Sequence, residues 1–93
     1  MGGENVYAVE VENVLTRHPA VAEVAVIGTP HSVFGEVVKA VVVLQLGMAC
    51  EERELKRHCV ERLASFKVPQ VFEFREALPR NPSGKVVKRQ LRG

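Results

Sequence analysis

The stretch that decides the predicted fold is VAEVAVIGTPHSVFGEVVKAVVVLQL, residues 21–46. Residues 21–28 and 37–46 are apolar almost throughout and rich in valine, which is typical of strands covered on both faces. The segment between them, TPHSVFGE, contains Pro30 and Gly35 and predicts a loop. The sequence therefore predicts two buried strands that can pair as antiparallel neighbours across this loop.

Helical periodicity is present on both sides of these strands. Residues 7–18 place their less polar side chains on one stripe, and Pro19 then ends the helix. Residues 51–64 repeat an apolar side chain at every fourth position, and the acidic residues near their start suit the positive end of a helix dipole. The first stripe consists of Tyr7, Val11, Val14, Leu15 and His18, and the second of Leu55, Cys59 and Leu63.

The remainder of the chain predicts a third strand and an end rich in turns. Residues 71–75, VFEFR, predict a short edge strand, and residues 76–85, EALPRNPSGK, predict turns. Residues 86–92 predict one or two final helical turns with Val87 and Leu91 facing inward. Neither a repeat nor a linker divides the chain, so we expect one domain over residues 1–93. The predicted class is α+β, a small sheet of about three strands packed with helices.

Composition and charge argue against several classes of protein. A net charge of +2 and an aromatic content of 5% do not favour nucleic-acid binding. No apolar run approaches the roughly 20 residues that span a bilayer, and no secretory signal opens the sequence, so no transmembrane segment is expected. Cys50 and Cys59 do not make a disulfide framework. We therefore expect two reduced thiols in a cytoplasmic protein.

The end of the chain, RNPSGKVVKRQLRG, places Lys85 directly after Pro82, Ser83 and Gly84. It is not a phosphate-binding P-loop, because the first glycine is missing and Val86 stands where a hydroxyl should hold Mg²⁺. The three histidines lack metal-ligand spacing, so no metal site is expected. The basic side chains of this tail could contact phosphates, or could simply complement the dipole of a helix end, which residue types alone favour. They are Lys85, Lys88, Arg89 and Arg92.

The order of five motifs adds a family resemblance. GGENVYAVEVENVL, HPAVAEVAVIG, FGEVVKAVVVL, SFKVPQ and LPRNPSGKVVKRQLR follow one another from Gly2 to Arg92. In this order and spacing they resemble the C-terminal domain of adenylate-forming (AMP-binding) enzymes, and among these the acyl-CoA synthetases. The resemblance implies a ligase that joins a carboxylic acid to ATP, releases pyrophosphate and passes the acyl group from AMP to CoA.

Partners and cofactors follow from the same resemblance. The full-length enzyme would use ATP, Mg²⁺ and CoA, none of them bound tightly to residues 1–93 alone. Its large N-terminal nucleotide and acyl domain would lie outside these residues, and this chain by itself would be inactive. Acyl selectivity would reside in that larger domain, so the carboxylic acid cannot be named.

Roles for individual residues are also implied by the resemblance. Lys85 matches the catalytic lysine of the family's PSGK loop, in which Pro82, Ser83 and Gly84 support it. A cation there lowers the electrostatic barrier when a carboxylate attacks the α-phosphate of ATP. Domain rotation between the two half-reactions would then bring a second loop to the active site and line the path of the CoA pantetheine. That loop consists of Gly2, Gly3 and Glu4.

Other positions depart from the family pattern or have an ordinary alternative explanation. Arg62 and Lys67 are possible contacts for CoA phosphates, although ordinary surface charge is the favoured explanation. Ala8 replaces the usual proline, and Phe34 replaces the tryptophan found in many members. A different class of function also stays open: a free-standing binding or regulatory module with this fold and no catalysis. The intact PSGK motif favours the enzyme domain.

Overall fold

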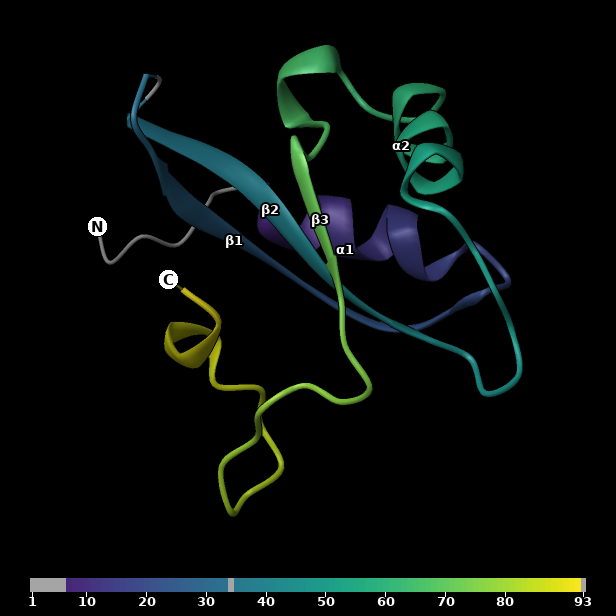
Figure 1. Ribbon diagram of the computed structural model, residues 1–93, viewed down its shortest axis with the longest axis vertical. Coiled ribbons are helices and arrows are strands. Elements are labelled where there is room, and N and C mark those ends of the chain that lie inside the picture. Colours follow the sequence, from purple (N-terminus) through teal and green to yellow (C-terminus); the bar gives the residue numbers. More distant parts are fainter. Residues whose placement is uncertain (1–6, 34, 93) are drawn as a thin grey trace.

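The computed structural model describes residues 7–33 and 35–92 and shows a three-stranded mixed sheet (Figure 1). β1 (Val21–His31) and β2 (Gly35–Leu44) form an antiparallel hairpin, in which Val26 lies opposite Ala40. β3 (Val71–Phe74) is parallel to β2, and the strand order is β1-β2-β3. This arrangement confirms the predicted α+β class, the antiparallel pair and the third strand at an edge.

The loop predicted over residues 29–36 is wrong. Both strands continue through most of it, with Thr29 opposite Val37 and Pro30 opposite Glu36. β1 is an edge strand, which is where a sheet can accommodate a proline. Gly35 has φ +78, a value that favours glycine, and so permits a tighter reversal of the chain than the prediction assumed.

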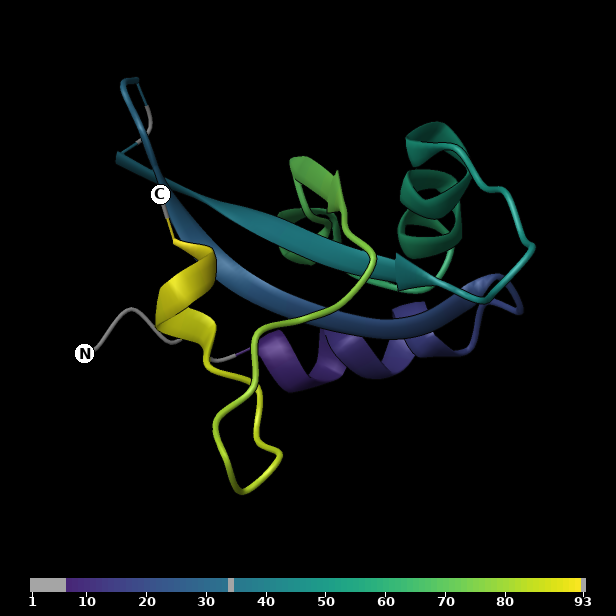
Figure 2. The same cartoon turned by 60° about the horizontal axis from the view of Figure 1, so that its bottom comes forward.

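Two α-helices pack on the sheet, and both are shorter than predicted. α1 (Ala8–Thr16) lies against β1, and α2 (Glu52–Val60) packs beside α1 (Figures 1 and 2). The stripe predicted for α1 is buried at Val11, Val14 and Leu15, as expected. At its two ends, Tyr7 and His18 are half-buried. After α2 the chain passes through the 3-10 turn η1 (Ser65–Lys67).

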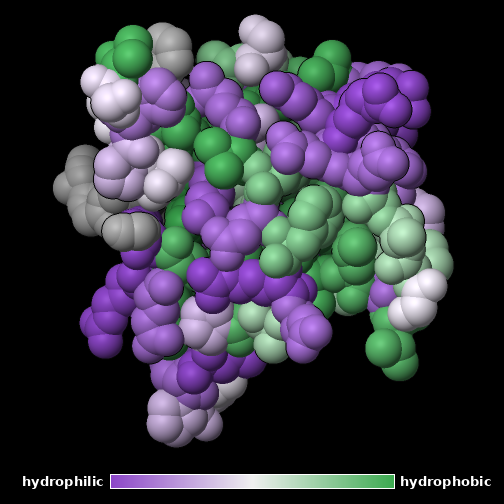
Figure 3. Space-filling model, viewed as in Figure 1, coloured by the Kyte–Doolittle hydropathy of each residue, from purple (hydrophilic) through white to green (hydrophobic). Residues whose placement is uncertain are grey.

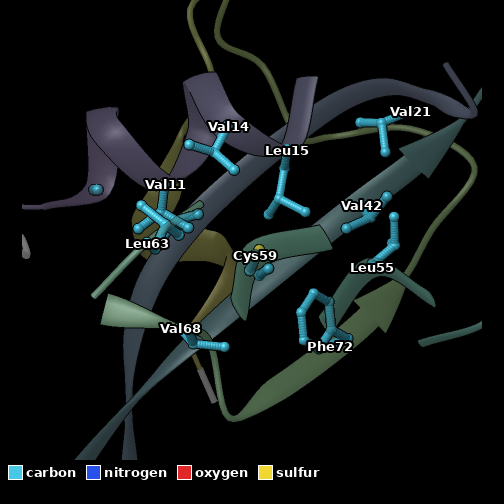
Figure 4. Close-up of a cluster of buried hydrophobic side chains, with 13 residues drawn as sticks. Val11, Val14, Leu15, Val21, Val42, Leu55, Cys59, Leu63, Val68 and Phe72 are labelled. Atoms are coloured by element: carbon cyan, nitrogen blue, oxygen red, sulfur yellow. The ribbon is translucent and has the colours of Figure 1, made fainter. Parts of the chain in front are cut away.

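The main core lies between the helices and one face of the sheet. Leu15, Leu55 and Phe72 come from α1, α2 and β3, and Figure 4 shows their side chains in one cluster. Leu15 and Leu55 are 0% exposed, so the two helices are anchored to each other as well as to the sheet. The remaining buried members are Ala8, Val11, Val14, Val21, Val26, Ala40, Val42, Cys59, Leu63 and Val68.

A second core covers the opposite face of the sheet. Ala25, Ile27, Val41 and Val43 point to this face, and the C-terminal segment covers them. Leu78 and Leu91 are buried in it, with Val86 packed at its side. The strands are therefore covered on both faces, as their apolar composition predicts.

The C-terminal segment ends in a short 3-10 helix, η2 (Lys88–Leu91). Leu91 faces inward as expected, whereas Val87 is only half-buried. The helical turns predicted from residue 86 therefore begin two residues later, and they form a 3-10 helix. Across residues 7–33 and 35–92, no helix is long and apolar enough to cross a membrane.

Candidate functional site

Lys85 lies in a small hairpin that projects from the sheet, at the bottom of Figures 1 and 2. An isolated antiparallel bridge joins Arg80 to Val86 at its base. The Asn81 amide donates to the Lys85 carbonyl over 2.9 Å, and the Gly84 amide donates to the Asn81 carbonyl over 2.9 Å. Gly84 has φ +90, which a residue with a side chain rarely adopts. The predicted loop is therefore a hydrogen-bonded turn closed onto itself.

The side chain of Asn81 shapes this turn from within. Its Oδ1 accepts from the Ser83 amide at 3.0 Å, the Ser83 hydroxyl at 2.8 Å and the Lys85 amide at 3.0 Å. Asparagine at the first position of a β-turn and proline at the second are the residue preferences of a type I turn. Asn81 and Pro82 thus explain locally why the chain turns here. Pro82 belongs to the supporting loop expected from the sequence, whereas Asn81 was not among the expected supporting residues.

Lys85 takes no part in the ion pairs of the described residues. The residue is exposed, and no carboxylate within residues 7–33 and 35–92 pairs with it. The surface around this hairpin, at the bottom of the space-filling view, is mainly hydrophilic (Figure 3). The hairpin therefore presents an available positive charge at an extremity of the fold.

Lys88 has a structural partner instead. Its Nζ lies 3.0 Å from Oε2 of Glu12 in α1, and this same oxygen accepts from the Val26 amide at 2.8 Å. The sequence interpretation placed Lys88 as a cation at a helix end, and the structure adds a carboxylate partner on another element. The two contacts of Glu12 connect α1, the edge of β1 and the start of η2.

Arg62 and Lys67 are held by neighbours on the domain's surface. Lys67 Nζ lies 2.8 Å from Glu10 and 5.4 Å from the ring centroid of Tyr7. The Arg62 guanidinium donates to the His58 carbonyl at 3.0 Å. These contacts are the ordinary surface interactions that the sequence left open as an alternative, and a role with CoA stays a prediction.

Three potential metal ligands that are distant in sequence lie together: His18, Cys50 and Glu54 have ligand atoms within 4.8 Å of one another. His18 Nε2 lies 2.8 Å from Glu54, and the Ala20 amide donates to His18 Nδ1 at 3.1 Å. Since an amide can only donate, Nδ1 is the acceptor of the neutral ring and Nε2 carries the proton. A metal at Nε2 would have to displace that proton and break the bond to Glu54.

Electrostatics in this cluster favour the same hydrogen-bonded state. The hydrogen bond from His18 lowers the pKa of Glu54. Burial, with Glu54 nearby, raises the pKa of the Cys50 thiol and so disfavours its thiolate. Only a thiolate binds metal strongly or acts as a nucleophile. The separation of these residues in sequence left no spacing signal by which the cluster could have been found.

The expected pantetheine loop, Gly2, Gly3 and Glu4, lies outside the described residues, as does Phe34. The role of this loop therefore stays a prediction. What the described residues do show is the position of Lys85 and of its support, Pro82, Ser83 and Gly84.

Comparison with known proteins identifies relatives of the whole domain. The family described as AMP-binding enzyme C-terminal domain matches residues 10–85. A fatty acid–[acyl-carrier-protein] ligase, ScoC of Streptomyces coeruleorubidus, is 50% identical over 92 residues, which make up 99% of this chain and 18% of that protein.

Solved structures agree with this result. The structure of a Mycobacterium tuberculosis fatty acyl CoA synthetase has a TM-score of 0.85 and 46% identity, covering 97% of this chain and 18% of that one. ATP-bound MatB of Rhodopseudomonas palustris has a TM-score of 0.89 and 44% identity, with the same coverage of 97% and 18%. The chain thus spans less than a fifth of the length of each of these relatives.

Proposed function

The chain belongs to the AMP-binding enzyme C-terminal domain family, and we propose that it is the mobile C-terminal domain of an ATP-dependent acyl-CoA synthetase. Its larger partner would be the nucleotide- and acyl-binding domain of the same enzyme. This chain covers only 18% of the length of each of two relatives, which supports the presence of a larger partner domain.

The observation that carries the proposal is the position of Lys85. Lys85 is exposed on a projecting hairpin, and none of the carboxylates of residues 7–33 and 35–92 forms an ion pair with it. An exposed cation of this kind suits an active site whose other residues belong to a second domain. Attack of a carboxylate on the α-phosphate of ATP brings two anions together, and Lys85 would stabilise the charge that gathers there while pyrophosphate leaves.

Substrates follow from the same reaction. ATP would enter with Mg²⁺, and ATP is the ligand named for the MatB structure. The mixed anhydride of the acid and AMP would then transfer its acyl group to the thiol of CoA, in line with the acyl-CoA synthetase relative. Gly2, Gly3 and Glu4 would line the pantetheine path after the domain rotates.

A protein-bound acceptor is a second candidate, because the relative ScoC is named as an acyl-carrier-protein ligase. The same loop, residues 2–4, would serve CoA or an acyl-carrier protein, since both present a thiol on a long thin chain. Fatty acids are the acids named for ScoC and for the M. tuberculosis relative, and we propose this substrate class and a place in fatty acid metabolism. The free thiols of Cys50 and Cys59 suit the reducing conditions of the cytoplasm.

The test is a chimaera in which this chain replaces the matching segment of the M. tuberculosis fatty acyl CoA synthetase. Pyrophosphate exchange measures adenylate formation, and thioester release from supplied acyl-AMP measures acyl transfer. Lys85→Ala should slow the first step by on the order of 10²–10³-fold and the second far less. Gly3→Leu should show the opposite pattern by blocking the pantetheine path.

The control is Arg89→Ala, which removes another exposed cation from the same tail. It should change neither half-reaction by more than about twofold. If Lys85→Ala slowed both steps equally, domain alternation would be refuted. A chimaera that folds and is unaffected by Lys85→Ala would favour the alternative, a binding or regulatory module without catalysis.

A further inference from the structure

Arg80 connects the body of the domain to the residue that precedes Lys85. Its Nη1 donates to the Gly84 carbonyl at 2.7 Å. Its Nη2 contacts the carboxylate of Glu23 in β1, which is 57 residues away in sequence. One planar group therefore contacts both the sheet and the tip of the hairpin.

The position of Glu23 depends on an irregularity in β1. Val21 lies opposite Leu44 and Glu23 lies opposite Val43, so β1 has one extra residue between these pairs. Such a bulge changes the face on which the following side chains lie. Val21 can then enter the core beneath the helices, while Glu23 stays on the face of Ala25 that the C-terminal segment covers.

The chemistry of the guanidinium explains why arginine suits this place. Its donors form a rigid planar fork, so one donor held by a carboxylate fixes the direction of the next. With Glu23 holding one side, the other side is aimed at Gly84. The carbonyl of Gly84 belongs to the peptide bond that leads into Lys85, so its position sets that of the lysine backbone.

The contact with Glu23 is too exposed to serve mainly as a stabilising ion pair. The side chains of Glu23 and Arg80 are 39% and 43% exposed. Pairs this exposed add little to folding stability because water screens them. An effect on the hairpin can therefore be separated from an effect on the fold.

We propose that Arg80, oriented by Glu23, is a positioning residue that holds the Lys85 hairpin at a set angle to the sheet. The inference rests on the proposed role of Lys85 in adenylate formation. A misplacement of a catalytic group by about 1 Å can cost on the order of 10²-fold in rate. The hairpin is anchored at its base by the buried Leu78, while Arg80 is the side chain that links its tip to β1.

Three variants test this proposal in two assays. Arg80→Met removes both contacts and keeps the apolar stem. The exchange of Glu23→Arg with Arg80→Glu restores an ion pair of opposite charges but leaves no donor for Gly84. Arg89→Met, on the same tail, is the matched control. The first assay is ¹⁵N relaxation and amide exchange of Gly84 and Lys85 in the 93-residue chain, and the second is pyrophosphate exchange by the chimaera.

Arg80→Met should increase the mobility of the two amides and lower kcat for adenylate formation by on the order of tenfold, with the KM for ATP within about twofold. The exchanged pair should remain slow, because it restores charge but not the bond to Gly84. Neither change should shift the urea midpoint appreciably, and Arg89→Met should behave as the unmodified chain.

Full recovery of the rate in the exchanged pair would overturn the proposal, since an ion pair alone would then suffice. Unchanged amide mobility and kcat in Arg80→Met would also overturn it. A large effect of Lys85→Ala beside a silent Arg80→Met refutes only this inference. A silent Lys85→Ala refutes the proposed function itself and removes any catalytic role for Arg80.

Discussion

Replacing Glu12 by alanine should lower the free energy of unfolding by about 2–4 kcal/mol. Oε2 of this carboxylate accepts from the Val26 amide at 2.8 Å and lies 3.0 Å from the Lys88 ammonium. Val26 is 1% exposed, so its amide would lose its acceptor in a largely dry place. Alanine is also the best helix former, so a loss of helix propensity cannot account for the effect.

The magnitude follows from the two contacts. A hydrogen bond to a charged group is worth about 1.5–3 kcal/mol, and a buried donor left without a partner costs about 1–3 kcal/mol. These overlap, because both describe the Val26 amide. The ion pair adds up to about 1 kcal/mol, since Glu12 and Lys88 are only 21% and 22% exposed. For a domain of this size, a loss of about 3 kcal/mol corresponds to a Tm lower by roughly 12–24 °C.

Urea unfolding followed by circular dichroism measures this change, with three further variants as controls. Glu12→Gln retains an acceptor for Val26 but not the charge, and Lys88→Met removes only the cation, so each should lose about 1 kcal/mol. Glu52→Ala, an exposed residue of α2, should change stability by less than about 0.5 kcal/mol. A loss in Glu12→Ala no larger than that in Glu12→Gln would refute the role assigned to the Val26 amide.

Two further predictions concern the core. Burial raises the pKa of Cys59 to about 11. The protonated thiol therefore contributes fully to the free energy of unfolding below the ordinary pKa of a thiol, and this contribution is lost as pH rises through 11. Urea titrations should show about 3 kcal/mol more alkaline destabilisation between pH 8 and pH 11 in the unmodified chain than in Cys59→Ala; equal losses would contradict the burial effect. Leu55→Ala should cost about 2–5 kcal/mol, because Leu55 is 0% exposed in the core beneath α1. Val60→Ala, at a position of the same helix that is 58% exposed, should cost less than about 0.5 kcal/mol, and equal losses in the two variants would refute the assigned packing.

The sequence by itself determined the elements and the candidate lysine. Valine-rich runs specified β1 and β2, and residues spaced four apart specified the buried stripe of α2, because these patterns depend only on near neighbours in the chain. Lys85 became the candidate through the family resemblance carried by five motifs in order, since the SGK stretch alone is a weak signal. Local residue types failed at Pro30, where the position of β1 at the sheet edge outweighed a breaker signal.

Only the tertiary structure decided which polar groups meet. Glu12 with Lys88, Glu23 with Arg80 and His18 with Glu54 are pairs that no spacing rule predicts. Each partner is a common surface residue whose neighbour depends on how strands, helices and the C-terminal segment pack. The Glu23 contact further requires the bulge in β1, since shifting a strand by one residue moves its side chains to the other face. The sequence could therefore nominate Lys85, whereas the direction in which its hairpin projects is set by contacts between distant parts of the chain.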